Sequence, residues 1–224
     1  MHREYQPEIL DAPGVPDAQA RRAYRDLARI HHWLGDTQFI IGAIRQNPWP
    51  VRRILDVGCA TGLVSEDVRR KLGVEAFGVD LNPRESVGAS VPMIQADAVR
   101  DSHPCADVAF SMHLGHHLTE NDVMGLIRNV GRFCRRFILL DLVRHAMPLA
   151  LFRVFVAPFV SRITAQDGIT SIRRSYTPAE LRRIAATALS GSGSTFRQSV
   201  TPFYTRQVID VSYEIRRAPS TFLI

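Results

Sequence analysis

The residues of this chain that are best placed for chemistry are three aspartates that each follow a short apolar stretch. Asp56 stands in "ILDVGCATG", Asp80 in "FGVDLNP" and Asp97 in "MIQAD". Gly58 and Gly62 follow the first acid, and their small size lets the backbone approach a ligand closely. A carboxylate at Asp80 can accept hydrogen bonds from both hydroxyls of a ribose, and one at Asp97 can accept from the exocyclic amine of adenine. The pattern therefore predicts a site for an adenosine-containing ligand.

A dinucleotide is the alternative ligand, but the glycine spacing argues against it. The stretch from Asp56 to Gly62 reads D-x-G-x-A-x-G and lacks the G-x-G-x-x-G pattern of dinucleotide sites. An acid directly before the glycines would also repel a pyrophosphate, so Asp56 suits a ligand with a positive charge. Cys59 is interpreted as a small wall residue, since no basic residue stands beside it in the sequence to activate a thiolate.

Parallel strands would bring the three acids together, and the apolar pattern predicts such strands. Short apolar strands are expected at 53–57, 75–79, 92–96, 106–111 and 137–142, with helices at 63–72, 119–130 and 178–188. This alternation is typical of parallel strands covered by helices. The tail from residue 194 predicts two strands joined by a short turn, the last of them antiparallel at or near a sheet edge. The expected fold class is α/β, a Rossmann-like sheet of seven mostly parallel strands with helices on both faces.

The other segments are expected to elaborate a single domain. Residues 1–50 predict a helical N-terminal extension whose apolar stripe continues through "FIIGAI", and residues 51–142 predict the cofactor-binding core. Residues 143–177 are expected to form a helical insertion, and residues 178–224 the final helix and strand hairpin. Only about a dozen residues separate Asp80 from the strand at Pro92, so the connecting helix is expected to be a stub.

Composition indicates which binding partners and which cellular compartment are expected for the chain. The chain carries a formal charge of +6, but its basic residues are scattered along the sequence, and a nucleic-acid partner is not expected. The three cysteines form no C-x-x-C and no apolar leader precedes them, so a reducing cytoplasm is expected. The longest apolar run, Met147 to Val160, is too short to span a bilayer. Contact with a membrane surface and the oligomeric state both stay open.

Four motifs in order resemble those of the class I S-adenosylmethionine-dependent methyltransferases: "ILDVGCATG", "GVDLNP", "QADA" and "ADVAFSMHLGHHL". The resemblance covers residues 53–142, and the hairpin tail also fits the sheet of that family. It implies S-adenosylmethionine as the cofactor. It further implies that the methionine moiety is lined by Asp56, Gly58, Cys59 and Gly62, the ribose and adenine by Asp80 and Leu81, and the adenine edge by Asp97 and Ala98, with Ser111 near the methionine amino group. Ala60 stands where the family commonly has glycine.

The acceptor side of the predicted site is less sharply marked. The loop "SMHLGHHLT" offers His116 and His117 as candidate catalytic bases, because histidine titrates near neutral pH. Residues 143–177 occupy the position where the resembling family builds its substrate pocket. The candidate acceptor-binding residues are His113, Asp141, His145, Phe152, Phe155, Arg174 and Tyr176, with Arg174 and Tyr176 at the rim of a lid. No metal site is expected.

The predicted function is methyl transfer from S-adenosylmethionine to a small apolar or aromatic acceptor, most simply to an oxygen whose proton a histidine removes. An RNA or other nucleic-acid methyltransferase is one alternative, although the loop after the fourth strand lacks the (N/D/S)-P-P-(Y/F) turn of amino-methylating enzymes. A cofactor-binding protein without turnover is another. The histidines could instead pack within the loop, and the apolar half of residues 143–177 could be ordinary core.

Overall fold

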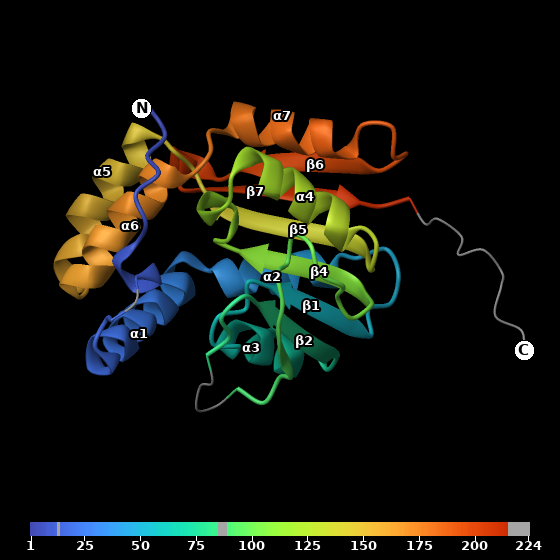
Figure 1. Ribbon diagram of the computed structural model, residues 1–224, viewed down its shortest axis with the longest axis horizontal. Helices are drawn as coiled ribbons and strands as arrows, with labels where there is room; N and C mark the ends of the chain where they lie inside the picture. The colour runs from blue at the N-terminus through green and yellow to red at the C-terminus, as the bar shows by residue number, and fades with distance from the viewer. Residues whose placement is uncertain (13, 85–88, 215–224) are drawn as a thin grey trace, which may run out of the picture.

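The computed structural model describes residues 1–12, 14–84 and 89–214, and within them it contains one seven-stranded sheet (Figure 1). The strands are β1 (Arg53–Val57), β2 (Glu75–Asp80), β3 (Met93–Gln95), β4 (Ala106–Met112), β5 (Cys134–Leu142), β6 (Thr195–Val200) and β7 (Arg206–Ser212). Their order is β3-β2-β1-β4-β5-β7-β6, and β7 runs antiparallel to both of its neighbours while the other pairs are parallel. The predicted fold class is confirmed.

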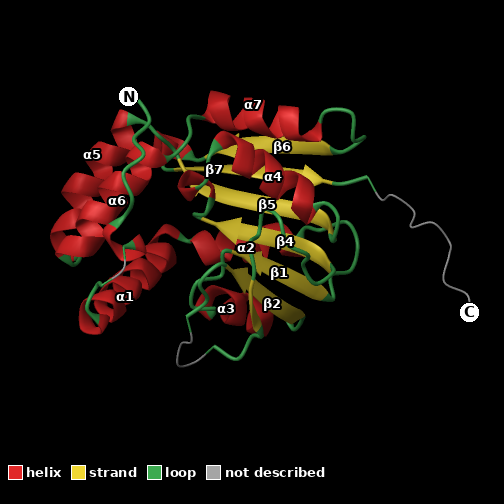
Figure 2. Cartoon of the chain, in the orientation of Figure 1, coloured by secondary structure: helices red, strands yellow, loops and turns green. Residues whose placement is uncertain are grey.

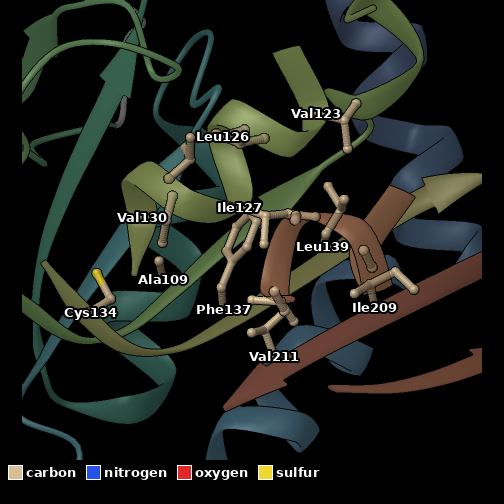
Figure 3. Packing of buried hydrophobic residues seen from close by; sticks show 14 of the residues in the cluster. Ala109, Val123, Leu126, Ile127, Val130, Cys134, Phe137, Leu139, Ile209 and Val211 are labelled. Atoms are coloured by element: carbon tan, nitrogen blue, oxygen red, sulfur yellow. The ribbon is translucent and has the colours of Figure 1, made fainter. Parts of the chain in front are cut away.

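Helices cover both faces of the sheet and bury two apolar clusters. On one face α4 (Glu120–Val130) and α7 (Pro178–Leu189) pack on β4, β5 and β7, where Leu126, Phe137 and Ile209 are fully buried (Figure 3). On the other face, α2 (Asp36–Arg45) and α3 (Leu63–Leu72) cover the sheet, with α3 in contact with β1 and β2 and α2 with β4. The side chain of Thr119 accepts a hydrogen bond from the Asp122 backbone and caps α4 at the start of the helix predicted for 119–130.

A third group of helices lies beyond the carboxyl ends of the parallel strands (Figure 2). It consists of α1 (Asp17–Leu34), α5 (Ala146–Phe155), the 3₁₀ turn η3 (Ala157–Phe159) and α6 (Arg162–Arg174), which together we call the helical cap. The buried carboxylate of Asp26 on α1 accepts from the backbone N–H of Ser161, and so joins α1 to the start of α6. The short turn η1 (Ile9–Asp11) of the N-terminal segment also packs on α6.

Two details differ from the sequence prediction. The N-terminal apolar stripe does not form one helix, because Gly35 adopts φ 71° and separates α1 from α2. The fifth strand begins at Cys134, three residues before its apolar core, since Cys134 pairs with Ala106 of β4. The last strand, β7, is antiparallel and lies next to the edge strand β6, as predicted. The expected stub helix between Asp80 and Pro92 falls partly outside the described residues.

Candidate active site

The turn between β1 and α3 opens the carboxyl edge of the sheet. Gly58 has φ +80°, a conformation that favours glycine, and a Cβ there would crowd Cδ2 of Leu114 at 3.2 Å. Ala60 has φ 47°, a left-handed conformation that alanine adopts only with strain. Ala60 thus keeps the kind of backbone conformation that glycine adopts most easily. Cys59 is buried, and its burial raises the pKa of the thiol, in keeping with a wall residue.

Among the described residues, the buried carboxylate of Asp56 has a single hydrogen-bond donor. Its Oδ2 accepts a hydrogen bond of 2.5 Å from Oγ of Ser65, and the residue is only 3% exposed. Burial raises the pKa of Asp56 to about 7, the nearby charge of Asp80 adds to this, and the Ser65 hydrogen bond opposes it. A buried carboxylate of this kind lacks a positive partner, which a cationic ligand would supply.

The other two acids lie at the ends of the neighbouring strands, as predicted. Asp80 ends β2, and its two carboxylate oxygens accept from the backbone N–H groups of Ala60 and Asn82 at 2.9 and 2.8 Å. Asp97 follows β3, where it accepts from the N–H of Val99 and pairs with Arg100 at 2.6 Å. Leu81 is largely exposed beside Asp80. Each acid is thus held by local hydrogen bonds while its remaining lone pairs stay free for a ligand.

Buried polar atoms without a partner mark the same edge. Within the described part of the chain, seven buried side-chain atoms make no hydrogen bond, on Trp49, His103, Ser111, His113, Arg174, Arg206 and Gln207. Oγ of Ser111 and Nδ1 of His113 stand at the end of β4, and Oε1 of Gln207 lies on β7 opposite Asp141 of β5. Unpaired buried groups cost free energy, so these three atoms fit a polar ligand that pairs with them. Together with Asp56, they fit a cofactor with a cationic head.

The histidine loop after β4 lies between the glycine turn and the end of β5. Leu114 packs against Gly58, and the His113 backbone N–H donates to the carbonyl of Leu140 on β5. Nε2 of His113 lies 3.1 Å from Oδ2 of Asp36, which also contacts Nδ1 of His31 at 2.9 Å. Because an ionised carboxylate can only accept, Nε2 of His113 carries a proton, while its Nδ1 makes no hydrogen bond within the described residues and lies 4.0 Å from Oδ1 of Asp141.

His116 is sealed between two carboxylates. Its Nδ1 lies 2.7 Å from Oδ1 of Asp141 and its Nε2 lies 3.4 Å from Oε1 of Glu8. Burial lowers the pKa of His116, but the two carboxylates outweigh it and raise the pKa to about 9. For Glu8 the effects have the opposite sign. Burial raises the pKa of this carboxyl, but its hydrogen bond to His116 and the charges of His116 and His117 outweigh burial and lower the pKa to about 2. At neutral pH His116 is therefore an imidazolium and Glu8 a carboxylate.

His117 is the more accessible of the two predicted bases. Its side chain is 27% exposed, compared with 3% for that of His116. Nδ1 of His117 lies 3.2 Å from Oδ2 of Asp11, and Nε2 lies 3.7 Å from Oε1 of Glu8. With the Nδ1 proton directed to Asp11, the lone pair of Nε2 is available, and the Glu8 carboxylate would stabilise a proton taken up there.

Two clusters in the described residues bring atoms of metal-ligating type within 4.8 Å of one another: Glu8, His116 and His117, and His31, Asp36 and His113. In both, the carboxylates already contact imidazole nitrogens, and Arg206 also pairs with Asp36. Burial raises the pKa of Asp36, but hydrogen bonds from His113 and His31 outweigh it and lower the pKa. The two clusters are joined through Asp141, whose Oδ1 lies 2.7 Å from Nδ1 of His116 and 4.0 Å from Nδ1 of His113.

The other predicted acceptor residues are spread over the cap. Phe152 packs on Gly168 between α5 and α6, whereas Phe155 is 66% exposed on the outer side of α5. His145 caps α5 and stacks on Tyr204 at 4.6 Å, away from the histidine loop. Nη1 of Arg174 lies 3.7 Å from Asp11, next to the loop.

Tyr176 does not lie at a rim. It is 1% exposed and belongs to the core, because its hydroxyl donates to the Leu118 carbonyl and accepts from Arg3. The sequence prediction also missed the carboxylates of Glu8, Asp11 and Asp36. The apolar residues around Asp36 are evident in the sequence, but acidic residues are common in the first turn of a helix. Nothing in the sequence therefore distinguishes Asp36 from an ordinary first-turn acid.

Acids and glycines at the carboxyl ends of a Rossmann-like sheet, next to a network of histidines, form the kind of edge where such sheets bind cofactors. Residues 55–136, less than half of the chain, match the family model described as a methyltransferase domain. These residues are therefore similar to a domain of enzymes that use S-adenosylmethionine. No curated protein sequence matches the chain.

Solved structures share the fold at low sequence identity. The plantazolicin methyltransferase BpumL, in complex with a pentazolic desmethylPZN analog and SAH, has a TM-score of 0.69 at 13% identity and covers 89% of this chain and 92% of its own. The methyltransferase domain of bacterial CtHen1 has a TM-score of 0.59 at 13% identity, over 80% of this chain and 97% of its own. Magnesium protoporphyrin IX methyltransferase from Synechocystis PCC 6803 has a TM-score of 0.55 at 14% identity, over 92% and 91%.

Proposed function

We propose that this enzyme transfers a methyl group to an oxygen of a small apolar or aromatic acceptor, and that His117 takes the proton of the attacking hydroxyl. The cofactor supplies a methyl group activated by a sulfonium. The observation that carries the proposal is the placement of Nε2 of His117 near Glu8, with Nδ1 held by Asp11, at the edge where the acids of β1 to β3 end. A base so held can accept a proton without reorienting.

The chain's own groups would divide the work. Asp56 and Ser111 would hold the cationic head of the cofactor, and Asp80 its ribose. His113 and Arg174, whose Nδ1 and Nη1 make no hydrogen bond within the described residues, would hold polar atoms of the acceptor. His116 would stay protonated and fix Glu8 and Asp141, so its role is to position the loop. Alignment of the acceptor with the methyl group then supplies much of the acceleration.

The test is the asparagine substitution of single histidines, with turnover measured from tritium-labelled S-adenosylmethionine. The acceptors tested are a panel of phenols and hydroxylated lipids. An RNA oligonucleotide is included to test the alternative that the acceptor is a nucleic acid. His117→Asn should lower turnover on the accepted phenol or lipid by about 10²- to 10⁴-fold and leave the affinity for S-adenosylhomocysteine unchanged, because the base touches only the acceptor. His32→Asn, a change at an exposed histidine of α1, is the matched control.

Full turnover of His117→Asn with an unaltered pH profile would exclude this histidine as the base. Methylation of the oligonucleotide in place of the small hydroxyl compounds would overturn the acceptor class. His116→Asn is measured with its urea midpoint, because removing one partner of a buried ion pair costs about 3 to 5 kcal/mol of stability.

A further inference from the structure

We infer that the helical cap docks on the surface of an anionic lipid bilayer, with the outer side of α5 entering the interface. The inference concerns a surface that the cofactor and the histidines do not use, and it stands independently of the acceptor proposed above.

The first observation is an apolar stripe that α5 turns outward. Met147, Leu151, Val154 and Phe155 recur at the spacing i, i+4, i+7 and i+8, which places them on one face of the helix. Val154 is 62% exposed and Phe155 66%. The opposite face, with Pro148, Leu149 and Phe152, already packs on the protein, so the exposed stripe is not needed for the fold.

The stripe continues beyond α5. Phe159 of η3, at the carboxyl end of the helix, is 69% exposed. At the amino end, the turn η4 (Pro202–Tyr204) packs beside α5, where Tyr204 stacks on His145 and Phe203 is 67% exposed. Exposed apolar side chains that stand out singly are ordinary, but a row of them along one helix marks an interaction surface.

The second observation is the charge of the cap. Its arginines outnumber its aspartates by eight to three, and it contains no lysine or glutamate, so most of the +6 charge of the chain resides there. Asp26 and Asp167, two of the three aspartates, are buried within hydrogen bonds. Exposed arginines of the cap are Arg21, Arg22, Arg25, Arg29, Arg153 and Arg162. Of these, Arg22, Arg25, Arg153 and Arg162 have no acidic partner within 4 Å in the described part of the chain.

The charge and the apolar surface of the helical cap together favour a lipid bilayer over a second copy of this chain as the binding partner. A second copy would bring two positively charged caps into contact, which costs free energy at each arginine pair. An anionic membrane instead attracts the arginines and accepts the apolar stripe in its headgroup region. Because α6 also contacts the N-terminal segment and the histidine loop, docking would place the acceptor side of the active site next to the membrane.

The test is cosedimentation of the purified full chain with vesicles, either of phosphatidylcholine alone or with about 30% phosphatidylglycerol. Binding is expected to the anionic vesicles and should weaken as NaCl rises. The double variant Val154→Ser/Phe159→Ser should lower the partition coefficient on the order of 30-fold. Arg153→Gln/Arg162→Gln should lower it about fivefold for each charge removed. The matched control is Val200→Ser/Arg197→Gln on the edge strand β6, which should bind like the unaltered chain.

Each variant is checked for fold by its affinity for S-adenosylhomocysteine. Failure of the unaltered chain to bind anionic vesicles at low salt would overturn the inference. So would unchanged binding of both cap variants, or equal loss in the β6 control. Light scattering that shows a dimer dissociated by Val154→Ser/Phe159→Ser would assign the stripe to contact between copies and would equally overturn the inference.

Discussion

The substitution Asp56→Asn tests the idea that the enzyme keeps a buried, unpaired carboxylate for its cofactor. The pKa of Asp56 is raised from its ordinary value near 3.8 to about 7 by burial. As pH rises from 4 to 7, the unfolded chain releases this proton before the folded one, so the group lowers the stability of the cofactor-free protein by about 1.4 kcal/mol per pH unit. Above pH 7 the accumulated loss levels off on the order of 4 kcal/mol.

Asparagine keeps the shape of the side chain, and its oxygen can still accept from Ser65, but it does not titrate. Any cost of burying the amide is constant with pH, so the slope of stability against pH is the diagnostic quantity. We expect urea unfolding of the variant to lose less stability than the unaltered protein between pH 5 and 7. Asp67→Asn, at a partly exposed acid of α3, is the control. Parallel pH profiles of Asp56→Asn and the unaltered protein would refute the reasoning.

The same carboxylate links cofactor binding to pH. A cationic head next to Asp56 favours its ionised form, so binding should release a proton, about half a proton per site near pH 7. Affinity should therefore increase as pH rises from 6 to 8. Calorimetry with S-adenosylhomocysteine in buffers of different ionisation enthalpy measures the release. A binding enthalpy that is independent of the buffer would contradict the assigned role of Asp56.

Two further predictions concern the same edge. Asp80→Ala should weaken binding of S-adenosylhomocysteine by about 10- to 100-fold, since each charge-assisted hydrogen bond lost contributes about 1.5 to 3 kcal/mol; unchanged affinity in calorimetry would count against a ribose contact. Ala60→Gly should raise the free energy of unfolding by about 0.5 to 1 kcal/mol, because glycine relieves the left-handed conformation at φ 47° and this gain exceeds its entropic cost. A urea midpoint below that of the unaltered chain would show that the turn is not strained at Ala60.

The sequence alone determined where the candidate cofactor side of this protein is predicted. Each of the three acids lies at or just after the end of a short apolar stretch, and the glycine turn is contained in nine consecutive residues, so local order is enough to single them out. Parallel strands then bring their carboxyl ends to one edge without any further information. The exact extent of the strands was less well predicted: β5 starts before its apolar run, because Cys134 already pairs with Ala106 of the neighbouring strand β4.

Only the tertiary structure decided the partners of the histidines and the direction of the apolar helix. His113 meets a carboxylate 77 positions away at Asp36, and Asp36 meets Arg206 at a separation of 170. No local pattern encodes such pairs, because they depend on how the N-terminal segment crosses the cap. Both faces of α5 are apolar, so the spacing of its apolar residues does not distinguish a buried face from an exposed one. The sequence therefore cannot predict which face packs on the rest of the protein. The packing of Phe152 against Gly168 determines which face of α5 is covered, because only one side of α5 can lie on α6. Val154 and Phe155 are left facing outward.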